Sequence, residues 1–561
     1  MLTPWGEKLD KGNVLTEYPR PQMRRGGYVN LNGEWDYAFT VDGMEPDEWD
    51  GKILVPFSPE CELSGVGRIL RPGEYLWYHR DFTLPEHKGR VILHFGAVDQ
   101  ICTVYLNNVE ICSHVGGYLP FECDITHALA EVNRLVVCVM DDSDTSYHSR
   151  GKQKFKRGGI WYTPQSGIWQ TVWCECVPDD YVKNLRITPD FDSASVDISA
   201  ETVGSSPAIA VFGGKEYPLP AAIPVPDFEA WTPGNPKLYD FSVICGEDRV
   251  ESYFAMRKFS VEKDKNGVKR LFLNGAPLFH NGMLDQGYWS DGMYTAPSDE
   301  ALIFDIQTAK DMGFNMLRKH IKVEPLRWYY HCDRLGMLVW QDMINGGGQY
   351  SPAIVSAPLV TGIHLKDDKY RLFARDDKKG RVQYELELRQ MIKHLYNCPC
   401  IAMWVPFNEG WGQFDSAKIC EVIRKLDSTR TVDHASGWHD QGIGDIKSLH
   451  VYFKKYVFKP DKLGRAVLLT EFGGYNYYCE GHCFGKTDFG YRKLKSVEAL
   501  TEDLRKLYAE QIKPAYEQGL AAAVYTQVSD VEDEVNGLIT YDRRVVKIAP
   551  EVMREIVSVD K

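Results

Sequence analysis

The sequence predicts two β-sandwiches followed by a (β/α)8 barrel, and three observations lead to this fold class. Residues 1–180 contain short runs rich in Val, Ile, Tyr and Trp that turn residues separate. Residues 181–260 continue with less hydrophobic strand-like runs, and residues 261–561 alternate apolar runs with helical patterns. Short strands at regular spacing favour sandwiches, whereas alternating strands and helices favour a parallel sheet covered by helices. The 561 residues are enough for about two to four domains.

The first two segments contain the clearest strand signals. In residues 1–180 the strongest runs are YLWYHRDFTL, RVILHFGAVDQICTVYLNNVEI and RLVVCVMD, and the pairs Asn107-Asn108 and Gly116-Gly117 mark turns. In residues 181–260 the clearest runs are NLRITPDF, ASVDISAE and LYDFSVICG. A segment of about 80 residues with such runs suits a small second sandwich.

Residues 261–561 contain eight apolar runs, the number that a (β/α)8 barrel needs. Helical patterns lie between the runs: Ser298 is a candidate N-cap, Pro325 suits a first turn, and Gly336 suits a helix end. About 300 residues is an ordinary length for such a barrel. The eight runs are PLFHNGM, NMLRKH, GMLVWQD, IAMWVPFNE, TVDHAS, SLHVY, AVLLTEF and AAVYTQVSD.

Nearly every one of these runs ends in side chains that can hydrogen-bond or ionise. In such barrels the active site lies at the carboxyl ends of the strands, which meet at one face. A purely structural barrel has no need of so many polar strand ends, so we expect a ligand site at this face. The residues concerned are His280, Asp285, Arg318, His320, Trp340, Asp342, Asn408, Glu409, Asp433, His434, His450, Tyr452, Glu471, Gln527 and Asp530.

Two glutamates in this set, Glu409 after the fourth run and Glu471 after the seventh, indicate a particular chemistry. Glycoside hydrolysis requires two carboxyl groups facing each other, one protonated to release the leaving group and one ionised to attack the anomeric carbon. Their mutual repulsion and their burial separate the two pKa values. Asn408 would then hydrogen-bond the sugar 2-hydroxyl, and Trp411 would stack on a ring. The alternatives are a solvated strand end for Glu409 and a capping or salt-bridged role for Glu471.

The composition limits the partners of the protein. A net charge of −13 argues against nucleic acid or an anionic membrane surface as a partner. The first residues lack the apolar core of a signal peptide, no stretch approaches the ~18 apolar residues of a transmembrane helix, and the 14 cysteines are scattered. We therefore expect a cytoplasmic protein with reduced thiols. Cys479, His482 and Cys483 offer three metal ligands without an evident fourth, so we expect neither a metal nor a cofactor.

Several longer motifs occur in the order typical of a known family. GGYLPFECDIT and QSGIWQTVW lie in the first segment, and GFNMLRKHIKVEP, CDRLGMLVWQD, NCPCIAMWVPFNEG and TEFGGY follow in the barrel. Over essentially its whole length the chain resembles glycoside hydrolase family 2, the family of bacterial β-galactosidases, β-glucuronidases and β-mannosidases. The resemblance implies a jelly-roll sugar-binding domain at residues 1–180, an immunoglobulin-like sandwich at residues 181–260 and a catalytic barrel at residues 261–561.

The resemblance also implies roles for individual residues. Glu409 matches the family's acid/base and Glu471 its nucleophile, which implies retention of configuration at the anomeric carbon. MINGGGQY stands where the large β-galactosidases carry magnesium ligands, which agrees with the expectation of no essential metal. Asn408 matches the amide beside the family's acid/base, and Arg318 matches the arginine that orients the nucleophile. His320 matches the family's substrate-binding histidine, and Tyr452 matches its active-site tyrosine.

The sequence leaves several alternatives for the terminal sugar of the substrate. We expect a retaining exo-β-glycosidase that removes a galactoside or a galacturonide from a small carbohydrate. A β-glucuronidase or other hexuronidase, or a β-mannosidase, is the alternative. The Asn-x-Lys motif of β-glucuronidases occurs only as Asn235-Pro236-Lys237, outside the barrel, which disfavours a standard β-glucuronidase. Hypotheses of other classes are a carbohydrate-binding protein with an inactive barrel and a metal-dependent hydrolase. By family analogy, we also weigh a homo-oligomer.

Further substrate contacts are predicted from charge and position. A uronic acid needs a fixed cation, and the loop at residues 149–159 is basic. The candidate cations are Arg150, Lys152, Arg157, Lys319, Lys322, Lys454, Lys455 and Arg492. The candidate readers of sugar hydroxyls are Trp438, His439 and Asp285, with Asp342 and Gln527 at neighbouring strand ends.

Overall fold

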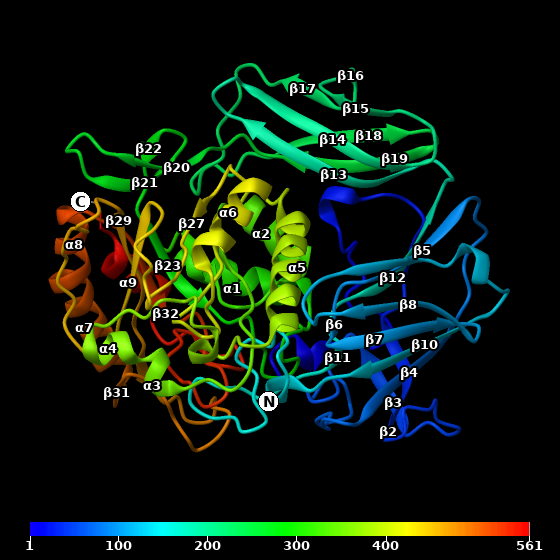
Figure 1. Ribbon diagram of the computed structural model, residues 1–561, viewed down its shortest axis with the longest axis horizontal. Coiled ribbons are helices and arrows are strands. Elements are labelled where there is room, and N and C mark those ends of the chain that lie inside the picture. Colours follow the sequence, from blue (N-terminus) through cyan, green and yellow to red (C-terminus); the bar gives the residue numbers. More distant parts are fainter. Residues whose placement is uncertain (560–561) are drawn as a thin grey trace.

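The computed structural model of the protein describes residues 1–559, in which two β-sandwiches accompany an α/β barrel (Figure 1). In Figure 1 the amino-terminal sandwich is blue to cyan, the second sandwich lies at the top, and the barrel runs from green to red. The predicted fold class is confirmed.

The amino-terminal sandwich packs two antiparallel sheets, of strand order β3-β2-β4-β10-β7-β8 and β1-β12-β5-β9. Strand β7 (Ile101–Leu106) buries every second residue, as a strand with one face on a core does. Trp35, Tyr78 and Phe95 belong to the core between the sheets. The other strands are β1 (Tyr28–Asn30), β2 (Gly33–Thr40), β3 (Gly51–Val55), β4 (Tyr75–Phe82), β5 (Arg90–Phe95), β6 (Val98–Asp99), β8 (Val109–Val115), β9 (Phe121–Asp124), β10 (Asn133–Met140), β11 (Gly167–Ile168) and β12 (Val172–Val177).

The second sandwich faces a three-stranded sheet, β13-β14-β17, with a four-stranded sheet, β16-β15-β18-β19. Its own core contains Ile198, Phe241 and Val250. Seven antiparallel strands in two sheets fit the expected immunoglobulin-like architecture. The strands are β13 (Tyr181–Asp190), β14 (Ser195–Val203), β15 (Ala208–Phe212), β16 (Lys215–Pro218), β17 (Ala221–Pro224), β18 (Tyr239–Cys245) and β19 (Asp248–Phe254).

The barrel contains all eight predicted strands in one parallel sheet of order β27-β26-β25-β24-β23-β32-β29-β28. Neighbours in this order are hydrogen-bonded, while β27 and β28 stand at its two ends, so the barrel is nearly closed. Its strands are β23 (His280–Asp285), β24 (Met316–Lys319), β25 (Leu338–Asp342), β26 (Ile401–Val405), β27 (Thr431–Val432), β28 (Ile446–Val451), β29 (Ala466–Gly473) and β32 (Leu520–Thr526). Short sheets beside the barrel contain β20 (Phe259–Lys263), β21 (Lys269–Leu273), β22 (Ala276–Pro277), β30 (Tyr475–Tyr477) and β31 (Arg492–Leu494).

Helix boundaries follow the predicted capping residues. The Ser298 side chain accepts a hydrogen bond from the Ala301 N–H at the start of α1, and Pro325 and Gly336 cap the two ends of α2. Gly336 has φ +72°, a conformation that glycine adopts at low cost. The helices are α1 (Asp299–Asp311), α2 (Leu326–Leu335), α3 (Pro352–Val355), α4 (Ala357–Thr361), α5 (Lys378–Leu395), α6 (Ser416–Leu426), α7 (Val497–Leu507), α8 (Lys513–Gln518) and α9 (Pro550–Val557).

The cysteines differ from expectation at one place. Cys112 on β8 and Cys123 on β9 form a disulfide, so the prediction that all thiols are reduced is wrong for this pair. The two residues are eleven positions apart, and the turn between their strands brings them together, which spacing alone did not reveal. Across residues 1–559 the helices are all too short or too polar to cross a membrane.

Candidate active site

Glu409 and Glu471 meet at the carboxyl ends of the barrel strands. Glu409 follows β26 in a left-handed backbone conformation, φ +52°, and Glu471 lies near the end of β29. Both are buried, with 8% and 4% of their surface exposed. One oxygen of each carboxylate and a ring nitrogen of His450 lie within 4.8 Å of one another. Such proximity of two carboxylates is typical of retaining glycosidases, in which the carboxyl groups are about 5–5.5 Å apart.

Glu471 is held from both sides. Arg318 Nη1 donates to Glu471 Oε1 at 3.2 Å, and the Tyr452 hydroxyl donates to Oε2. Burial and the charge of Glu471 raise the pKa of Tyr452 well above its usual range, so its hydroxyl stays protonated and remains a donor. These contacts fix the direction of the Glu471 carboxylate, which suits a nucleophile.

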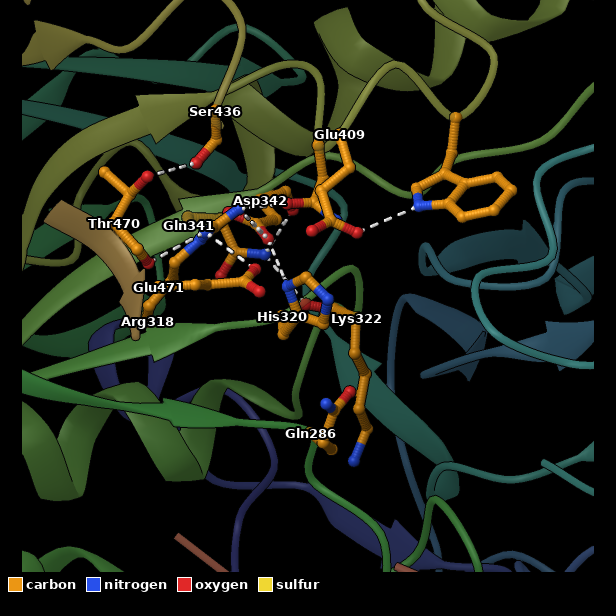
Figure 2. Close-up of polar contacts among 12 residues, drawn as sticks. Gln286, Arg318, His320, Lys322, Gln341, Asp342, Glu409, Ser436, Thr470 and Glu471 are labelled. Carbon is orange, nitrogen blue, oxygen red and sulfur yellow. Dashed lines mark hydrogen bonds and ion pairs between the residues drawn. The ribbon is translucent and has the colours of Figure 1, made fainter. Parts of the chain in front are cut away.

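Arg318 is the centre of a buried network (Figure 2). It binds both oxygens of Asp342 at 3.0 Å and donates to Asn408 Oδ1 at 2.8 Å. Burial alone would lower the pKa of Arg318, but Asp342 and Glu471 raise it, so the guanidinium stays charged. His320 Nδ1 lies 2.8 Å from Asp342 Oδ2. Burial, with the charge of Lys152, lowers the pKa of His320 well below its usual range, so the imidazole is neutral.

Glu409 is bound at both oxygens. His450 Nδ1 lies 2.8 Å from Oε1, and Trp411 Nε1 donates to Oε2 at 3.1 Å. Burial acts to raise the pKa of Glu409, but the hydrogen bond and charge of His450, helped by Trp411 and Lys152, outweigh burial and lower it. The two glutamates thus stand in different surroundings although they are neighbours.

His450 is a site residue to which the sequence assigned no role. It follows a register irregularity between β28 and β29 that places it opposite Glu471, and its Nδ1 lies 3.4 Å from Glu471 Oε2. Its Nε2 lies 3.2 Å from Ser436 Oγ, and Ser436 in turn donates to Thr470 Oγ1 at 3.0 Å. Tyr491 was also missed: its ring stacks on Tyr452 with centroids 3.7 Å apart. Tyr491 precedes β31, outside the barrel sheet, so no strand-end pattern pointed to it.

Several predicted contacts are engaged elsewhere. Asp285 binds Lys319 at 2.7 Å, and Gln527 bonds Gln286 and Asn536. Both ring nitrogens of His439 are hydrogen-bonded to backbone groups, Nδ1 to the Leu365 N–H and Nε2 to the Ile354 carbonyl. The ring therefore holds the segment at residues 351–367 in place. Trp438 is half-buried, with its ring 6.2 Å from that of His450.

Most of the predicted cations are also occupied. The buried Arg150 guanidinium donates to the Gly347 and Gly348 carbonyls. Lys322 binds Glu324 at 2.8 Å, burial lowers its pKa to about 8, and in Figure 2 it lies with Gln286 apart from the two glutamates. The others with acidic partners are Arg157 with Asp533, Lys319 with Asp285, Lys455 with Glu510 and Arg492 with Asp503. Lys454 is exposed.

Lys152 is the exception among these candidates. It is half-buried, pairs with no carboxylate of residues 1–559, and acts on the pKa values of both Glu409 and His320. It belongs to residues 149–163, a loop of the amino-terminal sandwich that reaches the barrel mouth. The Arg150 N–H donates to the Asn345 carbonyl at 2.9 Å, the Tyr162 hydroxyl donates to Glu534, and the Thr163 N–H donates to Glu532.

The cysteine and histidine cluster near β30 does not assemble a ligand set. His482 Nδ1 bonds Asp542 Oδ2 at 2.8 Å, and Cys483 Sγ bonds the Cys479 carbonyl. Within the described residues, the one group of three potential ligands that comes together is Glu409, His450 and Glu471. The geometry therefore lends no support to a metal site at residues 479–483.

Comparisons with known proteins agree with this architecture. Residues 68–165 match the family model for the sugar-binding domain of glycosyl hydrolases family 2, and residues 265–469 match the model for the TIM-barrel domain of the same family. A β-galactosidase from Thermoanaerobacter pseudethanolicus is 26% identical over 441 residues, which cover 72% of this chain and 54% of that protein. The chain thus spans about half the length, or less, of the curated relatives it matches.

Solved structures show the same fold over nearly the whole chain. A β-glucuronidase from an uncultured Clostridium sp. superposes with a TM-score of 0.75 at 19% identity, covering 95% of this chain and 98% of that one. A family 2 β-galacturonidase from Eisenbergiella tayi, solved with galacturonate, gives a TM-score of 0.72 at 20% identity, covering 97% and 99%. With both domain models matched in order and the fold shared end to end, the chain belongs to glycoside hydrolase family 2.

Proposed function

We propose that the protein is a retaining exo-β-D-glycosidase that removes a terminal, galacto-configured sugar. The observation that carries the proposal is the pair Glu409 and Glu471, two buried carboxylates whose oxygens approach within 4.8 Å. A carbohydrate-binding protein with an inactive barrel has no need of this pair, nor of the contacts that orient each member.

The reaction proceeds in two displacements. Glu471 attacks the anomeric carbon while Glu409 gives its proton to the departing glycosidic oxygen, which leaves a covalent glycosyl ester on Glu471. Glu409, now ionised, then takes a proton from water as the water oxygen attacks the anomeric carbon and the ester bond breaks. The sugar is released with its original configuration, and Glu409 is protonated again.

The neighbouring residues position these two groups. Arg318 and Tyr452 aim the Glu471 oxygens. The side-chain oxygen of Asn408 accepts a hydrogen bond from Arg318, so its side-chain NH₂ group is left to donate to the sugar 2-hydroxyl. His320, neutral and bonded through Nδ1 to Asp342, offers Nε2 to a sugar hydroxyl.

Lys152 supports a uronide as the terminal sugar. A carboxylate on the sugar would find an unpaired ammonium near Glu409 and His320, whereas the other candidate cations that face the barrel are already bonded. The E. tayi β-galacturonidase supports the same choice, and the β-galactosidase relatives support a neutral galactoside as the second candidate.

The test is a comparison of kcat/KM on five p-nitrophenyl β-glycosides, carrying galactose, galacturonate, glucuronate, glucose and mannose. We expect hydrolysis with retention and a preference for galacturonide. Lys152→Gln should reduce kcat/KM on the uronide by about tenfold or more and leave the galactoside rate nearly unchanged, since one charged hydrogen bond contributes about 1.5–3 kcal/mol. If the wild type prefers the neutral galactoside, the terminal sugar is galactose, the second candidate. If it hydrolyses none of the five substrates, the proposed glycosidase function is refuted.

A further inference from the structure

Three aromatic side chains from distant parts of the chain meet beside Glu409. Trp161 belongs to the loop of the amino-terminal sandwich, Tyr350 follows β25, and Trp411 follows β26. The ring centroids of Trp161 and of Tyr350 each lie 5.1 Å from that of Trp411, and they are 6.2 Å from each other. All three rings are half-buried, so each keeps part of its apolar surface open at the mouth of the barrel.

The position of this aromatic cluster relative to Glu409 indicates what it meets. Trp411 Nε1 donates to Glu409 Oε2, while the other oxygen faces His450 and, beyond it, Glu471. An acid catalyst contacts the oxygen that departs with the aglycone, so the aglycone lies on the acid's side of the site. The cluster is on that side, away from Glu471.

The chemistry of the cluster favours a flat-faced ring. Half-exposed aromatic faces stack on the C–H face of a pyranose or on an aryl ring. The Lys154 ammonium lies 3.9 Å from the centre of the Trp161 ring and pairs with no carboxylate of residues 1–559. Burial, with the nearby Arg150 charge, lowers the pKa of Lys154. An anionic group on a bound ring would offset both effects and stabilise the charged ammonium.

We propose that Trp161, Tyr350 and Trp411 form an aglycone subsite for a ring that carries an acidic group, with Lys154 as the receiver of that group. The natural substrate is then a terminal sugar linked to an acidic sugar ring or to an acidic aryl group. This inference rests on the proposed glycosidase function and deepens it by naming the class of leaving group.

The experiment compares substrates that share the terminal sugar and differ in the leaving group. The β-glycosyl fluoride of the preferred sugar has no aglycone ring, whereas a disaccharide of that sugar linked to galacturonate and a carboxyphenyl glycoside present the two sources of an acidic ring. Trp161→Ala should lower kcat/KM on one or both ring substrates by about tenfold, and on the fluoride by less than about twofold. Trp161→Phe should restore most of the loss, because it keeps an aromatic face.

Controls separate the subsite from the fold and from the catalytic reaction. Trp49 is a half-buried tryptophan of the same sandwich that stacks on His79, and Trp49→Ala should leave all rates as in the wild type. Hydrolysis of the fluoride by the wild type tests the glycosidase function without the subsite. A wild type inactive on the fluoride and on both ring substrates would overturn the function and the subsite together.

The charge of the subsite has its own test. Lys154→Gln should lower kcat/KM on the galacturonate-linked disaccharide about tenfold more than on the same disaccharide linked to galactose. If Trp161→Ala lowers kcat/KM equally on the fluoride and on the ring substrates, or lowers it on none of them, the aromatic subsite is overturned. Equal effects of Lys154→Gln on acidic and neutral disaccharides would overturn the acidic aglycone. The larger loss, on disaccharide or on carboxyphenyl glycoside, identifies the source of the ring.

Discussion

Replacing His450 by Gln should move the alkaline limb of the pH profile of kcat/KM to higher pH. Glu409 is buried, and burial alone would raise its pKa; the hydrogen bond and charge of His450 at 2.8 Å reverse this. Glu409 can donate a proton only while it is protonated, so a lowered pKa ends its action as an acid at lower pH. Without His450 the protonated form of Glu409 persists to higher pH, so the alkaline limb moves to higher pH as well.

The magnitude comes from the contact distance. An opposite charge within about 4–6 Å changes a carboxyl pKa by about 1–3, and a change of one corresponds to about 1.4 kcal/mol between the two protonation states. We therefore expect the alkaline limb of the pH profile to move to higher pH by at least about one pH unit.

The assay is the pH dependence of kcat/KM, which reports the free enzyme. It should use a glycoside with a poor leaving group, so that proton donation limits the rate. Ser436→Ala is the matched control: it removes the partner of His450 Nε2 and leaves the imidazole beside Glu409, so its limb should stay near that of the wild type. An alkaline limb that stays in place or falls in the Gln variant would refute this account of Glu409.

Four further predictions concern the same site. Glu471→Ala should lower kcat by at least about 10⁴-fold, and azide should restore turnover with an α-glycosyl azide as product; a β-azide would refute the nucleophile assignment. Glu409→Gln should reduce the rate on a disaccharide about 10²-fold more than on a dinitrophenyl glycoside, which needs no acid; equal losses would contradict the acid role. Arg318→Met removes the guanidinium that binds both oxygens of the buried Asp342, and it should cost the barrel about 3–5 kcal/mol of unfolding free energy, measured in denaturant. Full activity should persist in EDTA, whereas its loss would revive a metal-dependent mechanism.

Much of the fold followed from patterns that act locally. The eight apolar runs became the eight barrel strands, and Ser298, Pro325 and Gly336 delimit helices as predicted. These features depend on side-chain periodicity and on capping, which neighbouring residues decide. Glu409 and Glu471 were placed together by the same logic, because parallel strands end at one face.

The remaining parts depend on packing that local patterns do not encode. His450 reaches both glutamates because of a register irregularity between β28 and β29, and no periodicity in the SLHVY run indicates it. Lys152 was one of eight candidate cations, and its distinction arises only in the folded chain, where six of the others find partners and Lys454 is exposed. His439, expected to read the sugar, is engaged by two backbone groups, which lie 74 and 85 positions earlier in the chain.

The loop at residues 149–163 has a consequence for how the protein forms. Tyr162 and Thr163 are anchored by Glu534 and Glu532, about 370 positions later in the chain. During synthesis the start of this loop can dock on Asn345 and Gly347 as soon as that part of the barrel exists, but its end at Tyr162 and Thr163 has no docking partner until Glu532 and Glu534 have left the ribosome. Contacts of such long sequence separation form late and slowly. Catalytic competence should consequently appear only after residues 532–534 have been made, well after the sandwiches have become protease-resistant.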